Sequence, residues 1–178
     1  MRTVFALQLA FILFAHSLLA ADDDPRNIAG YGKTVWGMTE DEVLQAEAPL
    51  AQKLDPPVKT AGGGIRAVTI SDIKVGSKAG FSAQFIFDSK DRKLTQVTLE
   101  SPKLSSSRES RDTFSDIEKL LTEKYGSPTY KQEGKNVSWK LTKRTIELMN
   151  VNIPQAGWVQ VYVMYKPVGA SADASKNL

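Results

Sequence analysis

Cysteine is absent from this chain of 178 residues, and its single histidine, His16, lies in an apolar segment at the amino terminus. If that segment is cleaved, the remaining protein has neither thiol nor imidazole side chains. It then lacks the cysteine–histidine and serine–histidine pairs of nucleophilic hydrolases and the ligands of most zinc sites. Without cysteine there is also no disulfide bond, so the burial of a hydrophobic core must supply the stability.

The chain also has only one long hydrophobic run, which lies at its start. Arg2 provides a charged beginning, residues 4–19 are mainly apolar, and the small Ala20 and Ala21 precede three aspartates. This arrangement is typical of a cleavable signal peptide, which we predict over residues 1–21 with cleavage near Ala20 or Ala21. No cysteine follows the run and no later stretch is long enough to span a bilayer, so we expect neither a lipid anchor nor a membrane span. The predicted location is periplasmic or secreted.

Charge of one sign is not in large excess. The chain has 23 basic and 20 acidic residues, a formal net charge of +3, and the two signs are mixed along the sequence. Proteins that bind nucleic acid gather basic residues in patches, so we expect no nucleic-acid partner. Asp22, Asp23 and Asp24 lack the spaced oxygen ligands and the glycine of a calcium loop. The sequence therefore predicts no metal site and no cofactor.

Two motifs have the residue types of catalytic or phosphate-binding sites but lack the flanking residues or the helix that such sites require. Glycines 62–64 are not followed by the lysine and serine or threonine of a phosphate-binding loop. Ser71 and Lys74 have the spacing of some hydrolase pairs, but such pairs lie on a helix, whereas this segment is strand-like. We therefore predict no catalytic residue.

Two helices are predicted from their start and stop residues. Thr39 followed three residues later by Glu42 forms a capping box at the start of a short helix. Ser106 and Glu109 form a second box at the start of a longer helix, which ends at Gly126. The apolar residues of this longer helix recur at helical spacing and predict one buried face: Phe114, Ile117, Leu120, Leu121 and Tyr125.

Seven segments have the alternation or the β-branched composition of strands. They are residues 65–75, 81–87, 94–99, 129–132, 137–142, 145–151 and 158–166. The apolar parity of the first segment changes near Ser71 and Asp72, which predicts a bulge or bend. Trp139 shares its face with two aliphatic residues and is expected in the core. Residues 56–64 contain two prolines and three glycines and are expected to form a loop.

These elements predict an α+β domain in which two helices pack on one face of an antiparallel sheet, in the order α-βββ-α-ββββ. Each half has a capped helix followed by a meander, which suggests a diverged tandem duplication. We expect a flexible arm over residues 22–33, a single α+β domain over residues 34–167 and a flexible tail over residues 168–178. The sheet face without helices is expected to be open.

The last predicted strand, residues 158–166, carries the candidate binding surface. Its valines and Tyr165 alternate onto one face, which we expect to pack under a helix. The other face holds the candidate binding residues Trp158, Gln160, Tyr162 and Met164. Aromatic residues and methionine are favoured at recognition surfaces, and the alternative is that this face is covered and belongs to the core.

Residues 36–43, with the sequence WGMTEDEV, residues 124–128, with the sequence KYGSP, and the later meander resemble a broad group of small exported bacterial proteins. The Gly-Met-Thr helix start is similar to that of the small lipoprotein subunit of the outer-membrane β-barrel assembly machine. The layout of helix plus meander is similar to β-lactamase-inhibitor-protein-like domains. The chain departs from the lipoprotein because it lacks the lipid-bearing cysteine and the glycine and proline that usually close the first helix. The resemblance implies a non-enzymatic envelope protein and transfers no catalytic residue.

The expected function is that of an exported, non-enzymatic module that binds an envelope protein or a cell-wall component through the open sheet face. One alternative is a cell-wall glycoside hydrolase that uses two carboxylates and needs no histidine. A purely structural envelope protein is the other alternative. A pair of acids in one pocket, at the separation found in glycosidases, would distinguish the hydrolase from the binding module.

Overall fold

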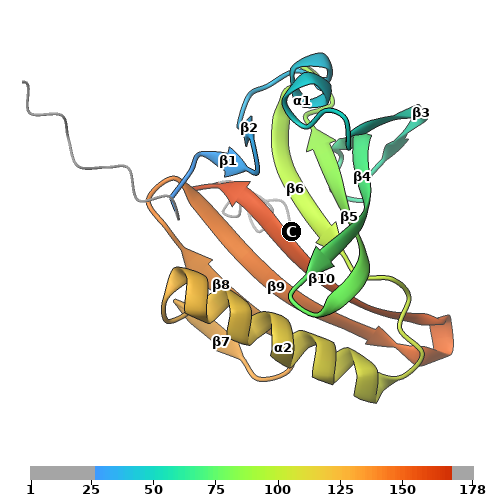
Figure 1. Ribbon diagram of the computed structural model, residues 1–178, viewed down its shortest axis with the longest axis vertical. Helices are drawn as coiled ribbons and strands as arrows, with labels where there is room; N and C mark the ends of the chain where they lie inside the picture. The colour runs from blue at the N-terminus through green and yellow to red at the C-terminus, as the bar shows by residue number, and fades with distance from the viewer. Residues whose placement is uncertain (1–26, 170–178) are drawn as a thin grey trace, which may run out of the picture.

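The computed structural model describes residues 27–169, so the predicted signal peptide and most of the predicted tail lie outside the described residues. Strands contain 48% of the described residues and helices 20%. The molecule is mostly β, with a large antiparallel sheet and two α-helices in its described part (Figure 1). None of the helices within residues 27–169 is long and apolar enough to cross a membrane.

The elements follow one another along the described chain as strands, with α1 (Glu40–Ala46) and α2 (Ser107–Tyr125) between them. The strands are β1 (Gly30–Tyr31), β2 (Thr34–Val35), β3 (Gln52–Lys59), β4 (Ile65–Val75), β5 (Lys78–Phe87), β6 (Leu94–Glu100), β7 (Tyr130–Gln132), β8 (Asn136–Lys140), β9 (Arg144–Ile153) and β10 (Trp158–Pro167). A short 3₁₀ helix, Pro154–Ala156, precedes β10. Strands β1 and β2 form a separate hairpin, and the other eight form one sheet in the order β3-β4-β5-β6-β10-β9-β8-β7.

The predicted α+β class and the order α-βββ-α-ββββ are wrong. After the β1–β2 hairpin, the order is one helix, four strands, a second helix and four strands, and the sheet dominates the fold. The two four-stranded meanders meet at their last strands, because β6 pairs with β10 in antiparallel register from Val97 opposite Tyr165 to Glu100 opposite Tyr162. This pairing makes one continuous sheet of eight strands.

Strand β3 occupies part of the segment that was expected to be a loop. Pro56 and Pro57 have no backbone N–H, and such residues argue against a strand in the middle of a sheet. However, β3 is an edge strand that pairs only with β4, and its register shifts between Lys53 and Val58. The prolines therefore lie where no ladder hydrogen bond is required of them.

The β1–β2 hairpin begins inside the segment that was expected to be a flexible arm, residues 22–33. The ring of Tyr31 packs against the ring of Tyr165, with 5.0 Å between their centroids. The side-chain oxygen of Asn27 accepts a hydrogen bond of 2.9 Å from the backbone N–H of Lys143. From Asn27 onward this segment is therefore packed against the sheet. Strands of two residues are too short to show the alternation on which strand prediction depends.

The capping box predicted for α1 is confirmed. The Thr39 hydroxyl accepts a hydrogen bond from the backbone N–H of Glu42, and the Glu42 carboxylate accepts one from the backbone N–H of Thr39. At α2, Ser106 caps the backbone N–H of Glu109 as predicted. The Glu109 carboxylate instead accepts hydrogen bonds from the backbone and side chain of Ser105, so the second box is only half formed.

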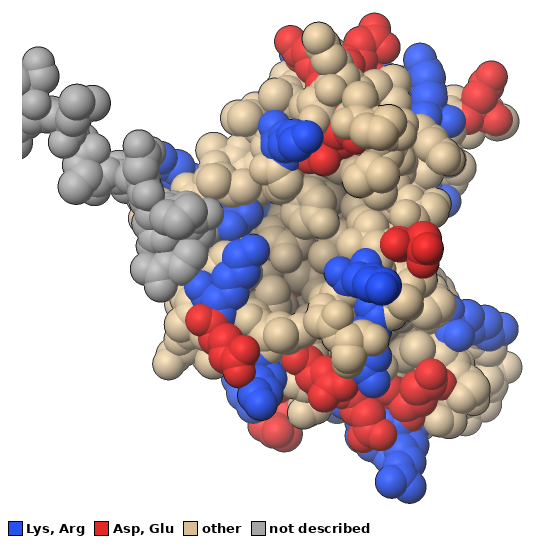
Figure 2. Space-filling view, in the orientation of Figure 1, with Lys and Arg blue, Asp and Glu red and all other residues tan. Residues whose placement is uncertain are grey.

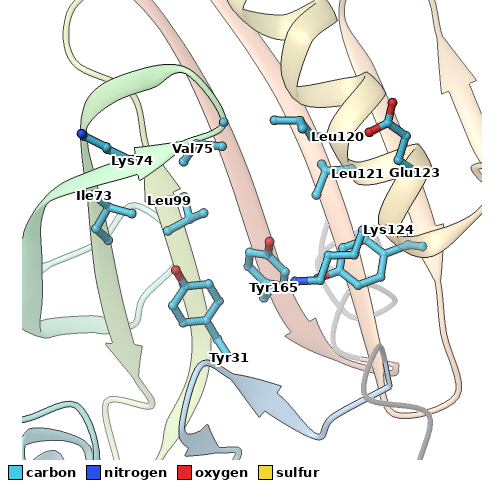
Figure 3. Close-up of a pocket in the computed structure, with 12 residues that line it drawn as sticks. Tyr31, Ile73, Lys74, Val75, Leu99, Leu120, Leu121, Glu123, Lys124 and Tyr165 are labelled. Carbon is cyan, nitrogen blue, oxygen red and sulfur yellow. The ribbon is translucent and has the colours of Figure 1, made fainter.

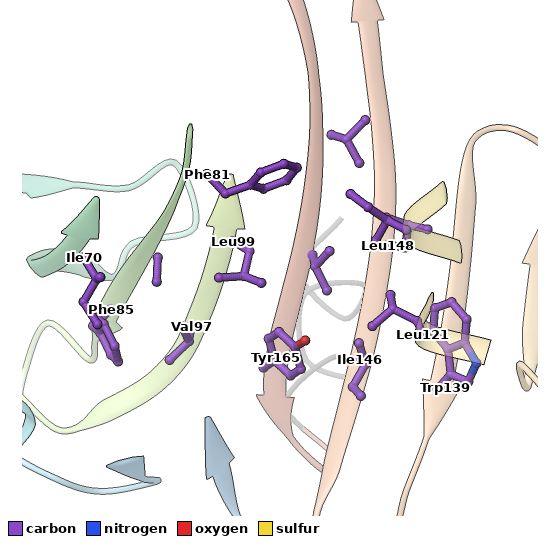
Figure 4. Packing of buried hydrophobic residues seen from close by; sticks show 14 of the residues in the cluster. Ile70, Phe81, Phe85, Val97, Leu99, Leu121, Trp139, Ile146, Leu148 and Tyr165 are labelled. Atoms are coloured by element: carbon purple, nitrogen blue, oxygen red, sulfur yellow. The ribbon is translucent and has the colours of Figure 1, made fainter. Parts of the chain in front are cut away.

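The hydrophobic core lies on one face of the sheet, which we call the inner face, and includes residues of α1, α2 and strands β4, β5, β6, β8, β9 and β10 (Figure 4). Phe114, Ile117 and Leu121 of α2 are buried, as are the inward valines of β10, and these placements confirm the predicted faces. Leu120 differs, because its side chain is 38% exposed. The predicted bend in β4 is confirmed by a register shift between Ile70 and Ile73 and by a φ of 56° at Asp72.

The two helices cover different parts of the sheet. Helix α2 packs on β9 and β10, whereas the seven-residue α1 packs on β4. The inner face between α2 and the β4–β5 hairpin therefore has no helix of the described chain above it. The space-filling view shows the molecule hollowed in this region (Figure 2).

Candidate binding surfaces on the two sheet faces

The four predicted binding residues lie on the face of the sheet opposite α2, which we call the outer face. Trp158 is 50% exposed, and Gln160, Tyr162 and Met164 are partly buried. The alternating residues Val159, Val161 and Val163 are buried on the inner face. The alternation read from the sequence thus separates the two faces correctly.

Hydrogen bonds hold three of these four side chains in place. The Trp158 indole N–H donates to the Tyr162 hydroxyl oxygen over 2.8 Å, and that hydroxyl donates to the Gln160 side-chain oxygen, also over 2.8 Å. The Gln160 amide then donates to a carboxylate oxygen of Glu100 over 3.1 Å and to the carbonyl oxygen of Ser101 over 3.0 Å. The aromatic rings are therefore fixed before any ligand arrives. Partial burial is the main cause that raises the pKa of Tyr162, so its hydroxyl stays protonated at neutral pH.

Trp158 and Tyr162 border a depression of 260 Å³ that we call the outer hollow. Five strands contribute to its lining: Val58, Lys59, Thr60, Arg66, Gln84, Ile86, Thr98, Glu100, Trp158 and Tyr162. In a flat sheet, strands four positions apart lie about 19 Å from each other, yet side chains of β3 and β10 border the same hollow. The sheet is therefore curved enough to gather residues from distant strands on its outer face.

The structure thus brings two of the predicted binding residues together with side chains that sequence reasoning missed. Lys59 lies on β3, which was expected to be a loop, and Arg66 lies on β4, which was predicted as a strand but not as a neighbour of the last strand on a curved sheet. Gln160 accepts the hydrogen bond from the Tyr162 hydroxyl and does not line the hollow. Met164 lies farther along β10, opposite Thr98 of β6, and does not line it either.

A larger depression, the inner cleft, lies between α2 and the β4–β5 hairpin on the inner face (Figure 3). Its volume is 540 Å³. Its lining consists of apolar, aromatic and charged residues: Tyr31, Ile73, Lys74, Val75, Gly76, Leu99, Leu120, Leu121, Glu123, Lys124, Tyr125 and Tyr165. This cleft was not predicted from the sequence, because Tyr31 fell in the expected arm and Leu120 was assigned to the buried helix face.

Arg144 supports the tyrosines at the floor of the inner cleft. Its guanidinium donates hydrogen bonds to the carbonyl oxygen of Gly30 and to the Tyr125 hydroxyl, and it lies 5.2 Å and 5.6 Å from the ring centroids of Tyr125 and Tyr165. Burial, with a smaller contribution from Glu47, raises the pKa of Tyr31 to about 12. Burial also raises the pKa of Tyr165 well above its ordinary value. These hydroxyls therefore remain hydrogen-bond donors throughout the physiological range.

Carboxylates are few in both depressions. Among residues 27–169, Glu100 is the one acidic residue that lines the outer hollow, and Glu123 is the one that lines the inner cleft. Within residues 27–169, no group of three or more histidine, cysteine, aspartate or glutamate side chains could hold a metal ion. Comparisons of the chain with protein-family models, curated proteins and solved structures found no match.

Proposed function

We propose that this protein is an exported, non-enzymatic binding module of the cell envelope that recognises a protein partner through the outer hollow. The observation that carries the proposal is the hydrogen-bonded pair Trp158 and Tyr162 at the border of a depression formed by five strands. Export is inferred from the charged start, apolar run and small residues of the amino-terminal segment.

The residues of the outer hollow are of the types that dominate protein interfaces. Tryptophan, tyrosine and arginine are enriched among the residues whose truncation weakens binding most, and the hollow contains Trp158, Tyr162 and Arg66. Because hydrogen bonds already hold the Trp158 and Tyr162 side chains, a partner does not have to immobilise them on binding.

The charges of the hollow indicate what a partner should present. Arg66 and Lys59 are basic, whereas Glu100 already accepts a hydrogen bond from Gln160. A protein loop that carries an acidic residue beside an aromatic or aliphatic residue complements this surface, since the guanidinium binds carboxylates and the rings bind apolar groups.

A binding role has more support than carboxylate-dependent hydrolysis of cell-wall sugar. Glycoside hydrolysis uses two carboxyl groups on opposite sides of the scissile bond, usually about 5–10 Å apart. Among the described residues, the outer hollow and the inner cleft each have a single acidic residue in their lining, Glu100 and Glu123 respectively. Another hollow beside α2 is lined by Glu118, Glu123 and Glu133, but Glu118 and Glu133 both form ion pairs with Lys131, at 2.6 Å and 3.2 Å.

The proposal is tested by capture from the native envelope with the exported protein and two variants. The double variant Trp158→Ser/Tyr162→Ser removes the aromatic pair, and Tyr130→Ser serves as a matched control because Tyr130 is exposed on β7 and lines neither depression. We expect the unaltered protein and the control to capture the same protein, identified by mass spectrometry, and the double variant to lose it. Equal capture by the double variant would overturn the proposal. Failure of the unaltered protein to retain any specific protein would also overturn it and would favour a purely structural role.

A further inference from the structure

We propose that the inner cleft is a second binding site, which holds a long-chain fatty acid with its chain along α2 and its carboxylate at Lys124. The site lies on the sheet face opposite the outer hollow, so this inference does not depend on the proposed protein partner. It rests on the walls of the cleft, its charges and the tyrosines at its floor.

The walls of the cleft suit an aliphatic chain. Leu120 and Leu121 of α2 face Val75 and Leu99 across the cleft, and Ile73 lies beside them (Figure 3). Leu120 is 38% exposed although it belongs to the apolar side of α2, so part of this wall is left in contact with water. A bound chain would remove that apolar surface from water, which is favourable in proportion to the area covered.

The cleft adjoins a hollow of 230 Å³ along α2, with which it shares Val75, Gly76, Leu120 and Glu123. Gly76 has a φ of +60°, and a Cβ atom there would lie only 2.7 Å from the nearest methyl carbon of Leu120. The β4–β5 turn and α2 are therefore in contact where the cleft meets this hollow. The main volume of 540 Å³ lies within the range of about 300–1,000 Å³ that is usual for small-ligand sites.

Positive charge at the floor suits a carboxylate. The Lys124 ammonium lies 5.3 Å from the centroid of the Tyr125 ring and reaches towards Tyr165, whereas the Glu123 carboxylate points away from the floor (Figure 3). In the described part of the chain, neither Lys124 nor Lys74 on the opposite rim takes part in an ion pair. An anionic ligand at the floor would therefore meet Lys124, whose charge is not already neutralised by a carboxylate of the described residues.

Tyr31 supplies a directed donor for the same carboxylate. Its hydroxyl group points into the cleft (Figure 3) and burial raises its pKa to about 12, so it stays protonated and can donate a hydrogen bond to a carboxylate oxygen. The Tyr165 hydroxyl is hydrogen-bonded to Tyr125 and helps to hold the floor in place. An apolar cleft that ends at an ammonium and a phenol group fits the two parts of a fatty acid.

The test is a fluorescence titration of the exported protein with cis-parinaric acid, a long-chain fatty acid whose emission rises in apolar surroundings, and with its methyl ester. We expect saturable binding of the acid and weaker binding of the ester, which has the same chain but no charge. Lys124→Gln should raise the Kd of the acid about fivefold, whereas Lys90→Gln, at an exposed turn, should leave it unchanged. Leu120→Asp should abolish binding, and Leu50→Asp, at an exposed leucine outside the cleft, should have no effect.

Four results would overturn this inference. Equal affinity for the acid and the ester, or an unchanged Kd in Lys124→Gln, would show that the carboxylate is not recognised. Unchanged binding by Leu120→Asp would place the probe outside the cleft. Binding to vesicles of anionic phospholipid without binding of the free acid would assign the surface to a membrane. The double variant Trp158→Ser/Tyr162→Ser should bind the acid normally, so failure of the outer-hollow proposal and failure of this one can be told apart.

Discussion

The indole N–H of Trp139 donates a hydrogen bond of 2.9 Å to the carbonyl oxygen of Gly126. Trp139 lies on β8 and Gly126 is the residue that ends α2, so this bond fixes the end of the helix to the sheet. Trp139 is only 1% exposed, as expected from its place between apolar neighbours, whereas Trp158 on β10 is half exposed. The two tryptophans therefore have different roles, one in the core and one at the surface.

We expect Trp139→Ala to lower the free energy of unfolding by about 3–5 kcal/mol, because it leaves a cavity and an unpaired carbonyl oxygen at Gly126. Trp158→Ala should cost less than about 1 kcal/mol, because its side chain is half exposed. Urea unfolding followed by circular dichroism measures both values. Similar midpoints for the two variants would contradict the assignment of Trp158 to an exposed surface.

Adjacent leucines on α2 offer a second matched pair. Leu121 is 7% exposed within the core and Leu120 is 38% exposed at the inner cleft. Leu121→Ala should lower the free energy of unfolding by about 2–5 kcal/mol, and Leu120→Ala by less than about 1 kcal/mol. Equal losses in denaturant unfolding would mean that the cleft side of α2 is as tightly packed as the core side.

The tyrosine floor predicts a loss of stability at alkaline pH. The pKa of Tyr31 is about 12 in the folded protein and 10.0 in an unperturbed tyrosine, so the folded state holds this proton more tightly than the unfolded chain. The contribution of Tyr31 is therefore fully present below about pH 10 and decreases as the pH rises towards about 12. Urea midpoints measured across this interval should fall less steeply for Tyr31→Phe than for the unaltered protein. Tyr130→Phe, at an exposed tyrosine, should retain the original slope.

The capping box of α1 can be tested through Glu42. The backbone and then the side chain of Thr39 lower the pKa of the Glu42 carboxyl by hydrogen bonding. Thr39→Ala removes the hydroxyl, so the pKa of Glu42 should rise partway to its ordinary value, and the free energy of unfolding should fall by about 0.5–2 kcal/mol. An NMR titration of Glu42 and urea unfolding measure the two effects. Thr39→Ser retains the hydroxyl and should change both much less.

Local patterns predicted the elements whose own sequence determines their structure. Helix α2 has a capping serine, an apolar stripe and a terminal glycine, and β10 alternates valines with larger side chains. The bend at Asp72 was visible because a change of parity moves apolar residues to the other face of the sheet. In each case neighbouring residues were sufficient to define the structure.

What the sequence could not predict depends on contacts between distant segments. Strand β3 was not predicted, because its two prolines indicated a loop. Proline is tolerated in a strand at the edge of a sheet, which is where β3 lies. The inner cleft combines Tyr31 with Tyr165, residues that are far apart in the chain and lie side by side in the fold. The outer hollow likewise depends on sheet curvature, which brings Arg66 beside the predicted Trp158 and Tyr162.

The two edges of the eight-stranded sheet also determine how this protein behaves when crowded. An unpaired edge can act as a template on which a strand of another molecule adds, and repeated addition produces fibrils. Strand β3 has Pro56 and Pro57, which provide no N–H groups, and a bulge that interrupts its register. Strand β7 at the other edge is only three residues long. Within residues 27–169, neither edge presents a long row of free backbone groups, so we expect that closely packed molecules do not add strands to this sheet.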